Sequence, residues 1–311
     1  MSIKPQITYN AKSDVFFGFP DTGRLRKNEN NNHMKLASEA ITVMISGLYR
    51  NYKQPIAFFL AHNSLGSQGQ LILLKKCIQA VKRIGLIPVA MTMDQGSTNI
   101  KMLREAGVSK NKPWIVVDGE KVGIFYDAPH LIKSARNALK KTNAVSNGKI
   151  ASFRHVELLY EVDVNSAIRL APKLLDKNIN LPPFASMNVA LATRTLSETC
   201  ASAIKYYVGT TQLPTEAINT SEFLLLYDRI FDTFNSRERF PDSIGKPLRK
   251  PITDESSHFT FLNEALVILN KTYFTKHDCF DEKKALTESK LLRATQRIPH
   301  YLRGLSREFF C

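Results

Sequence analysis

The sequence has few cysteines and no long apolar run, and each shortage narrows the class of protein. Its four cysteines, Cys77, Cys200, Cys279 and Cys311, show neither CxxC spacing nor a partnered run of histidines, which argues against a zinc site and a disulfide framework. We expect reduced thiols in an intracellular protein. No stretch of about eighteen apolar residues occurs, and the first residues lack an apolar signal core, so we expect neither a membrane span nor secretion.

Acidic residues are too few to balance the basic ones. The chain has 28 Asp and Glu against 43 Lys and Arg, a formal net charge of +15 and a pI of about 9.6. Such a surface attracts polyanions, with nucleic acid the first candidate and acidic lipid the second, although a basic balance also serves solubility alone. With 311 residues, 43% of them hydrophobic, the chain can fill one or two globular cores.

Strand and helix patterns alternate in the first part of the chain. Aromatic and β-branched residues predict three consecutive strands, at residues 15–19, 40–48 and 56–61. A helical pattern follows at 71–83, and Pro88 then opens an apolar run that ends at Asp94. This order is typical of a strand, a crossover helix and a parallel strand. A short helix at 96–106 and paired strands at 114–117 and 122–126 continue the α/β pattern.

The pattern changes beyond about residue 153, where helical spacing replaces strand-like runs. Apolar residues recur at helical spacing in three segments, at 156–160, 190–207 and 222–234. The polar stretch 142–148 and the region near Lys276 read as boundaries. We therefore divide the chain into an α/β domain at 1–145, a mostly α-helical domain at 146–277 and a C-terminal tail at 278–311.

Two acids stand at the ends of predicted strands. Asp21 follows the first strand and Asp94 the fourth, and the strand order that we predict makes these strands neighbours at a switch in chain direction. Two adjacent carboxylates repel each other unless a divalent cation lies between them, so Asp21 and Asp94 are candidate Mg²⁺ ligands. The structural alternative is that Asp21 is a turn residue and that Asp94 caps the following helix.

Asp127 and the helix after it also allow two interpretations. Asp127 is either a rival metal ligand at a strand end or the N-cap of the helix that begins near Pro129. On that helix Lys133, Arg136 and Lys140 align on one face. Such a stripe suits contact with the phosphate backbone of DNA, whereas a solvated helix face explains the same three charges without a ligand.

Five motifs carry a resemblance to a known family. They are Met1-Ser-Ile-Lys4, Gly18-Phe-x-Asp21, Met93-Asp-Gln-Gly-Ser-Thr-Asn99, Asp127-x-Pro-His-Leu-Ile-Lys-x-x-Arg-Asn137 and Phe231-Asp-x-Phe-Asn-Ser-Arg237. In combination they resemble the P-element transposase family, which includes the THAP-domain transposases, and the similarity extends to about Tyr273. The resemblance implies an enzyme that cuts and joins DNA with an RNase H-like catalytic domain interrupted by a helical GTP-binding insertion.

The resemblance assigns roles to the three predicted parts. Residues 1–145 resemble the first part of the RNase H-like domain with its mixed α/β sheet, residues 146–277 the GTP-binding insertion, and residues 278–311 diverge from the family. Asp21 and Asp94 match the first two acids of the family's metal-binding triad. The third acid, a glutamate beyond the insertion, has no counterpart here, and Met1 falls inside the catalytic core, after the expected THAP domain.

Nucleotide contacts are also implied by the resemblance. They fall on Lys173, Val189, Ser197, Asp232 and Asn235. An aspartate can accept from both N1–H and N2–H of guanine, and lysine and serine suit phosphate oxygens. Asn188 stands where the family has a lysine, and the sequence has no GxxxxGK[ST] loop. Without the resemblance, Asp232 and Asn235 would be ordinary polar residues of an amphipathic helix.

Together these features predict a fragment or decayed copy of a P-element-like DNA transposase. Its cofactors would be Mg²⁺ or Mn²⁺ and GTP, its partner the DNA of transposon ends, and its location the nucleus, with homo-oligomers expected and no membrane. We expect no DNA cleavage by the isolated chain, because the third acid is missing. The alternative is a non-enzymatic protein that binds nucleic acid or nucleotide and retains the transposase fold.

Overall fold

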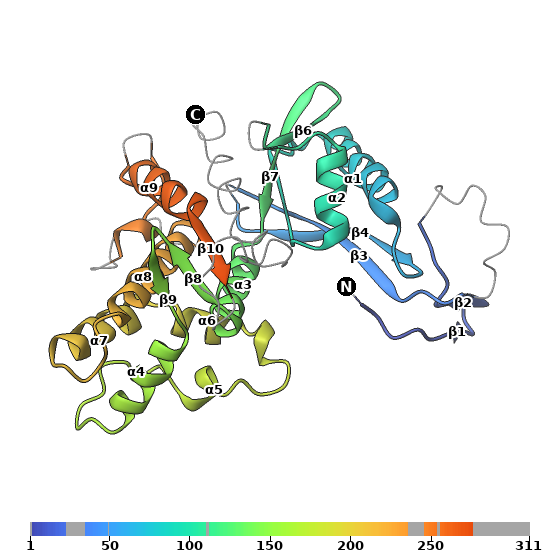
Figure 1. Ribbon diagram of the computed structural model, residues 1–311. Helices are drawn as coiled ribbons and strands as arrows, with labels where there is room; N and C mark the ends of the chain where they lie inside the picture. Colours follow the sequence, from blue (N-terminus) through green and yellow to red (C-terminus); the bar gives the residue numbers. More distant parts are fainter. Residues whose placement is uncertain are drawn as a thin grey trace. The chain divides into compact units, whose positions relative to one another are not determined.

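The chain forms two compact units (Figure 1). The computed structural model describes residues 2–22, 35–48, 50–109, 112–235, 246–253 and 256–275, so the predicted tail at 278–311 lies outside the described residues. The first unit contains Met1–Met91 and Gly96–Val122, and the second contains Thr92–Gln95 and the described residues from Gly123 onward. The candidate site below lies wholly in the second unit.

Strands dominate the start of the first unit and confirm the three predicted there. A hairpin joins β1 (Thr8–Asn10) to β2 (Val15–Phe17), and β3 (Glu39–Ser46) pairs antiparallel with β4 (Lys53–Ala61). The chain beyond β2 then meets β4. The backbone N–H of Asp21 donates to the carbonyl of Leu60 at 2.8 Å, and that of Leu60 donates back at 2.9 Å.

The predicted helix and the strands after it form where expected, but the described ladders do not join the strands on either side of the helix in one sheet, so the predicted parallel crossover pair is not observed there. These elements are α1 (Gly66–Arg83), β5 (Ala90–Met93), α2 (Ser97–Glu105), β6 (Trp114–Val117) and β7 (Glu120–Tyr126). Leu73, Ile78 and Val81 are buried along one face of α1, as the helical spacing requires. The β6–β7 turn uses Asp118 and Gly119, both at positive φ, which is the backbone of a tight hairpin turn.

The predicted pairing of the first and fourth strands is wrong for the hydrogen-bond ladders of the described residues. β5 pairs with β7 in the order β5-β7-β6, and β2 pairs with β1. The physical reason is that each strand finds a nearer partner: β1 is the other arm of the β2 hairpin, and β7 provides a long apolar strand for β5. The described ladders therefore do not pair β5 with the strand that precedes Asp21. They give no support for Asp21 and Asp94 as neighbours.

The second unit combines helices with a small sheet. After α3 (Ala128–Lys141), the strands β8 (Asn143–Ser146), β9 (Lys149–Ala151) and β10 (Thr272–Thr275) form a sheet in the order β10-β8-β9. The helices are α4 (Arg154–Val164), α5 (Asp176–Ile179), α6 (Val189–Thr195), α7 (Glu198–Gly209), α8 (Ala217–Phe234) and α9 (His258–Asn270), with short 3₁₀ turns η2 (Ala185–Met187) and η3 (Pro247–Arg249).

One core runs through this unit and includes residues from its sheet and helices. Leu139, Leu159, Ile204, Leu224 and Phe274 are all essentially inaccessible to solvent. The stretch 142–148, which the sequence pattern reads as a boundary, is instead the β8–β9 hairpin. Its turn is Asn147-Gly148, with both residues at positive φ, a strong hairpin signal that the polar composition obscures.

The described cysteines and helices bear on two expectations from composition, that of reduced thiols and that of no membrane span. Cys77 and Cys200 are free and buried, and burial raises the pKa of the Cys200 thiol to about 11, so this thiol stays protonated and unreactive at neutral pH. Cys279 and Cys311 lie outside the described residues. A search of the described helices finds none with the length and apolar character needed to cross a bilayer.

Phe274 gives a test of the role of β10 in the core. We expect Phe274→Ala to lower the free energy of unfolding by about 3–5 kcal/mol, because the change leaves a cavity where a fully buried ring packs. Phe184→Ala is the matched control, since this phenylalanine is 92% exposed, and its effect should stay within about 0.5 kcal/mol. Chemical denaturation measures both, and equal effects would contradict the placement of β10 in this core.

Candidate functional site

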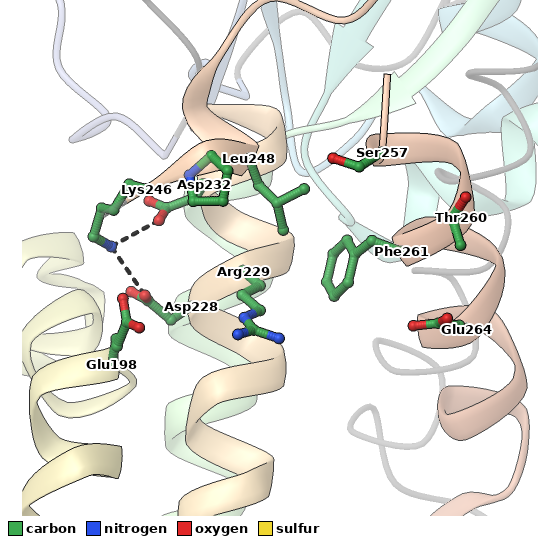
Figure 2. A pocket seen from close by; sticks show the side chains of 11 residues that line it. Glu198, Asp228, Arg229, Asp232, Lys246, Leu248, Ser257, Thr260, Phe261 and Glu264 are labelled. Atoms are coloured by element: carbon green, nitrogen blue, oxygen red, sulfur yellow. Dashed lines mark hydrogen bonds and ion pairs between the residues drawn. The ribbon is translucent and has the colours of Figure 1, made fainter. Parts of the chain in front are cut away.

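A pocket of about 340 Å³ opens in the second unit (Figure 2). Glu198 enters it from the first turn of α7, and α8, η3 and α9 contribute the other walls. Its remaining lining residues are Asp228, Arg229, Asp232, Lys246, Pro247, Leu248, Ser257, Thr260, Phe261 and Glu264. The volume is at the lower end of the range for small-molecule sites, roughly 300–1,000 Å³.

Two buried carboxylates form one wall of the pocket. Asp228 and Asp232 are one turn apart on α8, so they project from the same face, and they are only 6% and 5% exposed. Lys246 Nζ donates to Asp228 Oδ2 at 2.9 Å and to Asp232 Oδ2 at 2.7 Å (Figure 2). Arg249 Nε lies 3.2 Å from Asp232 Oδ1. The two cations thus balance the two acids.

The protonation of this group reflects a balance between burial and pairing. Burial raises the pKa of the Asp228 carboxyl, and the hydrogen bond from Lys246 opposes that shift. For Lys246, burial is the largest single effect and lowers the pKa, but the two carboxylates together outweigh it and leave the pKa raised. Lys246 therefore stays charged at neutral pH, and its charge is what makes two buried carboxylates tolerable there.

Three of the predicted nucleotide contacts lie in or beside the pocket. Asp232 lines it directly. Ser197 is the N-cap of α7, immediately before the lining residue Glu198, and its hydroxyl accepts from the Cys200 N–H at 3.2 Å. Asn235 ends α8 as its C-cap, less than one turn after Asp232. Of these three, only Asp232 lines the cavity, and Ser197 and Asn235 lie close along the chain to lining residues of α7 and α8.

The other two predicted contacts, Lys173 and Val189, are not among the lining residues. Lys173 is exposed between α4 and α5, and Val189 is the first residue of α6, where it packs against the core. The preceding residue, Asn188, is the N-cap of α6 and accepts from the Leu191 N–H at 3.2 Å. An asparagine at the position of the family lysine therefore has a local role, because its side chain satisfies a free helix N–H.

The predicted exposed stripe on α3 is wrong for two of its three residues. Arg136 is completely buried and Lys133 is 7% exposed, so neither faces solvent in this structure. Arg136 Nη2 donates to the Ser186 carbonyl at 3.1 Å, and Asn137 Nδ2 donates to the same oxygen at 3.1 Å. Burial lowers the pKa of the Arg136 guanidinium. A buried arginine that binds backbone oxygens holds the fold together and does not contact DNA from this position.

Lys140, the third residue of the stripe, has an internal role as well. Its ammonium donates to the carbonyl of Ile179, the last residue of α5, and lies 4.8 Å from the centre of the Phe153 ring. Burial lowers the pKa of Lys140, and the nearby Arg136 charge acts in the same direction. The contact caps the end of α5, since the last carbonyls of a helix lack partners within the helix.

For Asp127, the capping interpretation is confirmed. Its carboxylate accepts from the backbone N–H of His130 at 3.3 Å and also contacts Nδ1 of the same residue, at the start of α3. The Asp127 N–H donates to the Met93 carbonyl at 3.0 Å, which joins the end of β7 to that of β5. The role of a rival metal ligand is therefore not needed to explain this acid.

The two predicted metal ligands are both exposed, in different units. Asp21 belongs to the first unit, and Asp94 follows β5 in the second. The N-cap position of α2 is held by Gly96 and not by Asp94. Within the described ranges, no group of three or more His, Cys, Asp or Glu side chains is arranged to hold a metal ion. A metal held by Asp21 and Asp94 stays a prediction.

Comparison with known proteins decides the family. A model described as TNP-like, RNase H N-terminal domain matches residues 1–107, and one described as TNP-like, GTP-binding insertion domain matches residues 129–247. The chain belongs to the P-element-like transposase family. Human DNA transposase THAP9 is 26% identical over 313 residues, which are 94% of this chain and 32% of that protein. The Drosophila melanogaster transposable element P transposase is 26% identical over 240 residues, 76% of this chain and 29% of that protein.

The fold is that of the same family. A solved Drosophila P element transposase strand transfer complex matches with a TM-score of 0.77 at 22% identity, over 100% of this chain and 63% of that chain. This likeness shows the α/β fold with an RNase H-like domain. The chain spans about a third of the length of the curated P-element-like relatives that it matches.

Of the residues that line the pocket of this P-element-like chain, only Asp232 was predicted from the sequence, and three charged ones show what signal the others carried. Asp228 had a visible signal, since it lies four residues before Asp232 on a helix and must share its face. Glu198 follows the predicted contact Ser197 directly. Lys246 carried no signal, because it belongs to no periodic element and only precedes the short η3 turn.

Lys246→Met should destabilise the protein in a pH-dependent way. At pH 7 we expect a loss on the order of 2 kcal/mol, below the value for fully buried pairs because Lys246 is 32% exposed. Without the cation the already raised pKa of Asp228 rises further, so the folded state binds a proton more readily than the unfolded state. The loss should therefore shrink as the pH falls toward about 4.

Urea denaturation at several pH values checks this expectation, with Lys205→Met on the exposed surface of α7 as the control. The control should follow the unmodified chain at every pH. A loss in Lys246→Met that stays constant between pH 7 and 4 would show that Asp228 does not depend on Lys246.

Proposed function

We propose that the second unit binds a guanine nucleotide in the pocket between α7, α8, η3 and α9. The observation that carries this proposal is the pair of buried carboxylates, Asp228 and Asp232, held with Lys246 in a cavity. The segment that matches the GTP-binding insertion model, residues 129–247, contains all three residues. GTP is the cofactor that we propose for this chain.

The residues of the pocket fit a guanine base. Carboxylates are acceptors only, so Asp232 suits the N1–H and N2–H donors of guanine. Leu248 and Phe261 provide an apolar wall for the face of a purine. The volume of about 340 Å³ suits a nucleoside, so the phosphates would extend beyond the pocket. Ser197 and Lys173 are the phosphate contacts that the family resemblance names.

For the RNase H-like part we propose divalent-metal chemistry on DNA. Asp21 and Asp94 have the oxygen ligands that Mg²⁺ or Mn²⁺ prefers and would hold the ion. When bound, such an ion stabilises the charge that develops in phosphoryl transfer. DNA as the substrate is supported by the net charge of +15 and by the structural neighbour, which is a strand transfer complex. A nuclear location and assembly into homo-oligomers are parts of the same proposal.

A second candidate is binding of nucleotide or nucleic acid without catalysis. It is favoured by the contrast between the two sites: a pocket lined by paired acids is present in the second unit, whereas the described residues contain no three-ligand metal group. We therefore propose that the isolated chain binds nucleotide but does not cleave DNA.

Nucleotide titration tests the pocket. We expect GTP to bind with measurable heat and ATP to bind at least about tenfold more weakly, since adenine cannot offer two adjacent donors to one carboxylate. Asp232→Asn should remove this preference, and Asp176→Asn, an exposed acid at the start of α5, should leave it intact. Equal heats for GTP and ATP, or none for either, would reject the proposal.

Metal binding can be measured without DNA cleavage. We expect the chain to bind Mn²⁺, observed by the loss of the free-ion electron paramagnetic resonance signal, and both Asp94→Ala and Asp21→Ala to weaken this binding at least about tenfold. Asp118→Ala, in the β6–β7 turn, is the control for a lost carboxylate outside the predicted site. Unchanged binding in both variants would falsify a metal site at Asp21 and Asp94.

A further inference from the structure

We propose that Lys246 is a specificity-determining residue of the nucleotide pocket, whose ammonium donates to O6 of guanine while the adjacent Asp232 accepts from the base. The proposal rests on nucleotide binding at this site. It assigns a second task to a residue that the family resemblance does not name and that otherwise serves to balance two buried acids.

The ammonium of Lys246 can donate one more hydrogen bond. A lysine carries three N–H donors, and within the described part of the chain two of them bind Asp228 and Asp232. The side chain is 32% exposed and lines the pocket, so the third donor can reach a ligand there. An acceptor atom of a bound base is the partner that would complete the set.

Asp232 retains acceptor capacity next to this donor. Its Oδ2 accepts from Lys246 and its Oδ1 lies 3.2 Å from Arg249 Nε, whereas a carboxylate offers about four acceptor positions. The pocket therefore presents the Lys246 ammonium as a donor beside the Asp232 carboxylate, which can accept two further hydrogen bonds. The edge of guanine is complementary, because it presents the O6 acceptor followed by the N1–H and N2–H donors.

Adenine does not match this arrangement. At the position of O6 it has an amino group, so a donor would face the donor of Lys246. It also has no amino group at position 2, and its N1 is an acceptor that would face the carboxylate. Both mismatches leave polar groups unpaired in a partly buried site, which is the costly outcome for recognition.

The chain holds Lys246 in place from two directions. Its ammonium is bound to the two acids of α8, and the next residues form η3, where the carbonyl of Leu248 lies 3.1 Å from Nε2 of the buried His258 on α9. Leu248 itself is 8% exposed. A donor fixed before the ligand arrives loses little freedom on binding, which favours a role in selection of the base.

The test replaces a single atom of the ligand. The full chain is titrated by calorimetry with GTP and with 6-thio-GTP, which keeps N1–H and the 2-amino group but has a weakly accepting sulfur in place of O6. We expect the unmodified chain to prefer GTP about tenfold or more, as for a hydrogen bond from a charged donor. Lys246→Met should bind the two nucleotides equally, and Lys205→Met should keep the preference.

Each outcome separates this inference from the proposed function. If Lys246→Met weakens the binding of both nucleotides by the same factor and keeps the preference for GTP, Lys246 only neutralises the acids. That result overturns the inference but leaves the proposed nucleotide pocket intact. If the unmodified chain binds neither nucleotide, the proposed function itself fails. Lys246→Gln keeps a neutral donor and serves as the second variant if Lys246→Met does not fold. Its preference for GTP over 6-thio-GTP should be smaller than that of the unmodified chain, and an unchanged preference would reject the inference.

Discussion

The ion-paired group of Lys246 with Asp228 and Asp232 is the interaction on which the second unit's site depends. Two carboxylates one turn apart on α8 and almost fully buried would repel each other and lose hydration without a cation between them. The cation comes from outside the helix, so the same contact attaches the η3 segment to α8. The charge balance therefore also defines the walls of the pocket.

The cations of α3 show a different use of basic residues. Arg136 is buried, and its Nη2 donates to backbone oxygens of the η2 turn while its Nε donates to the Asn137 side chain. Lys140 also donates to a backbone carbonyl, that of Ile179 at the end of α5. Part of the formal charge of +15 thus belongs to side chains with a structural role and not to an exposed basic face. A helical spacing of charges indicates which residues share a face, but not which way that face points.

Local signals in the sequence predicted much of the fold. The strands of the first unit, the α1 pattern and the Asp127 cap follow from periodicity and from one residue type at a helix start. The β8–β9 hairpin was missed because Asn147-Gly148 lies in a polar stretch that also resembles a linker. Asp232 was found only through family resemblance, and Lys246 not at all. Contacts between residues far apart along the chain depend on its path, and no local pattern encodes that path.

The two proposed sites differ in what they require of the chain. Every residue of the nucleotide pocket belongs to the second unit, so the pocket forms wherever that unit folds. The predicted metal pair instead takes Asp21 from the first unit and Asp94 from the second, and it needs both units and a further ligand. The proposed nucleotide binding therefore does not depend on the predicted metal pair. For the same reason, a loss of nucleotide binding and a loss of metal binding are separable outcomes, since a substitution in one proposed site leaves the residues of the other unchanged.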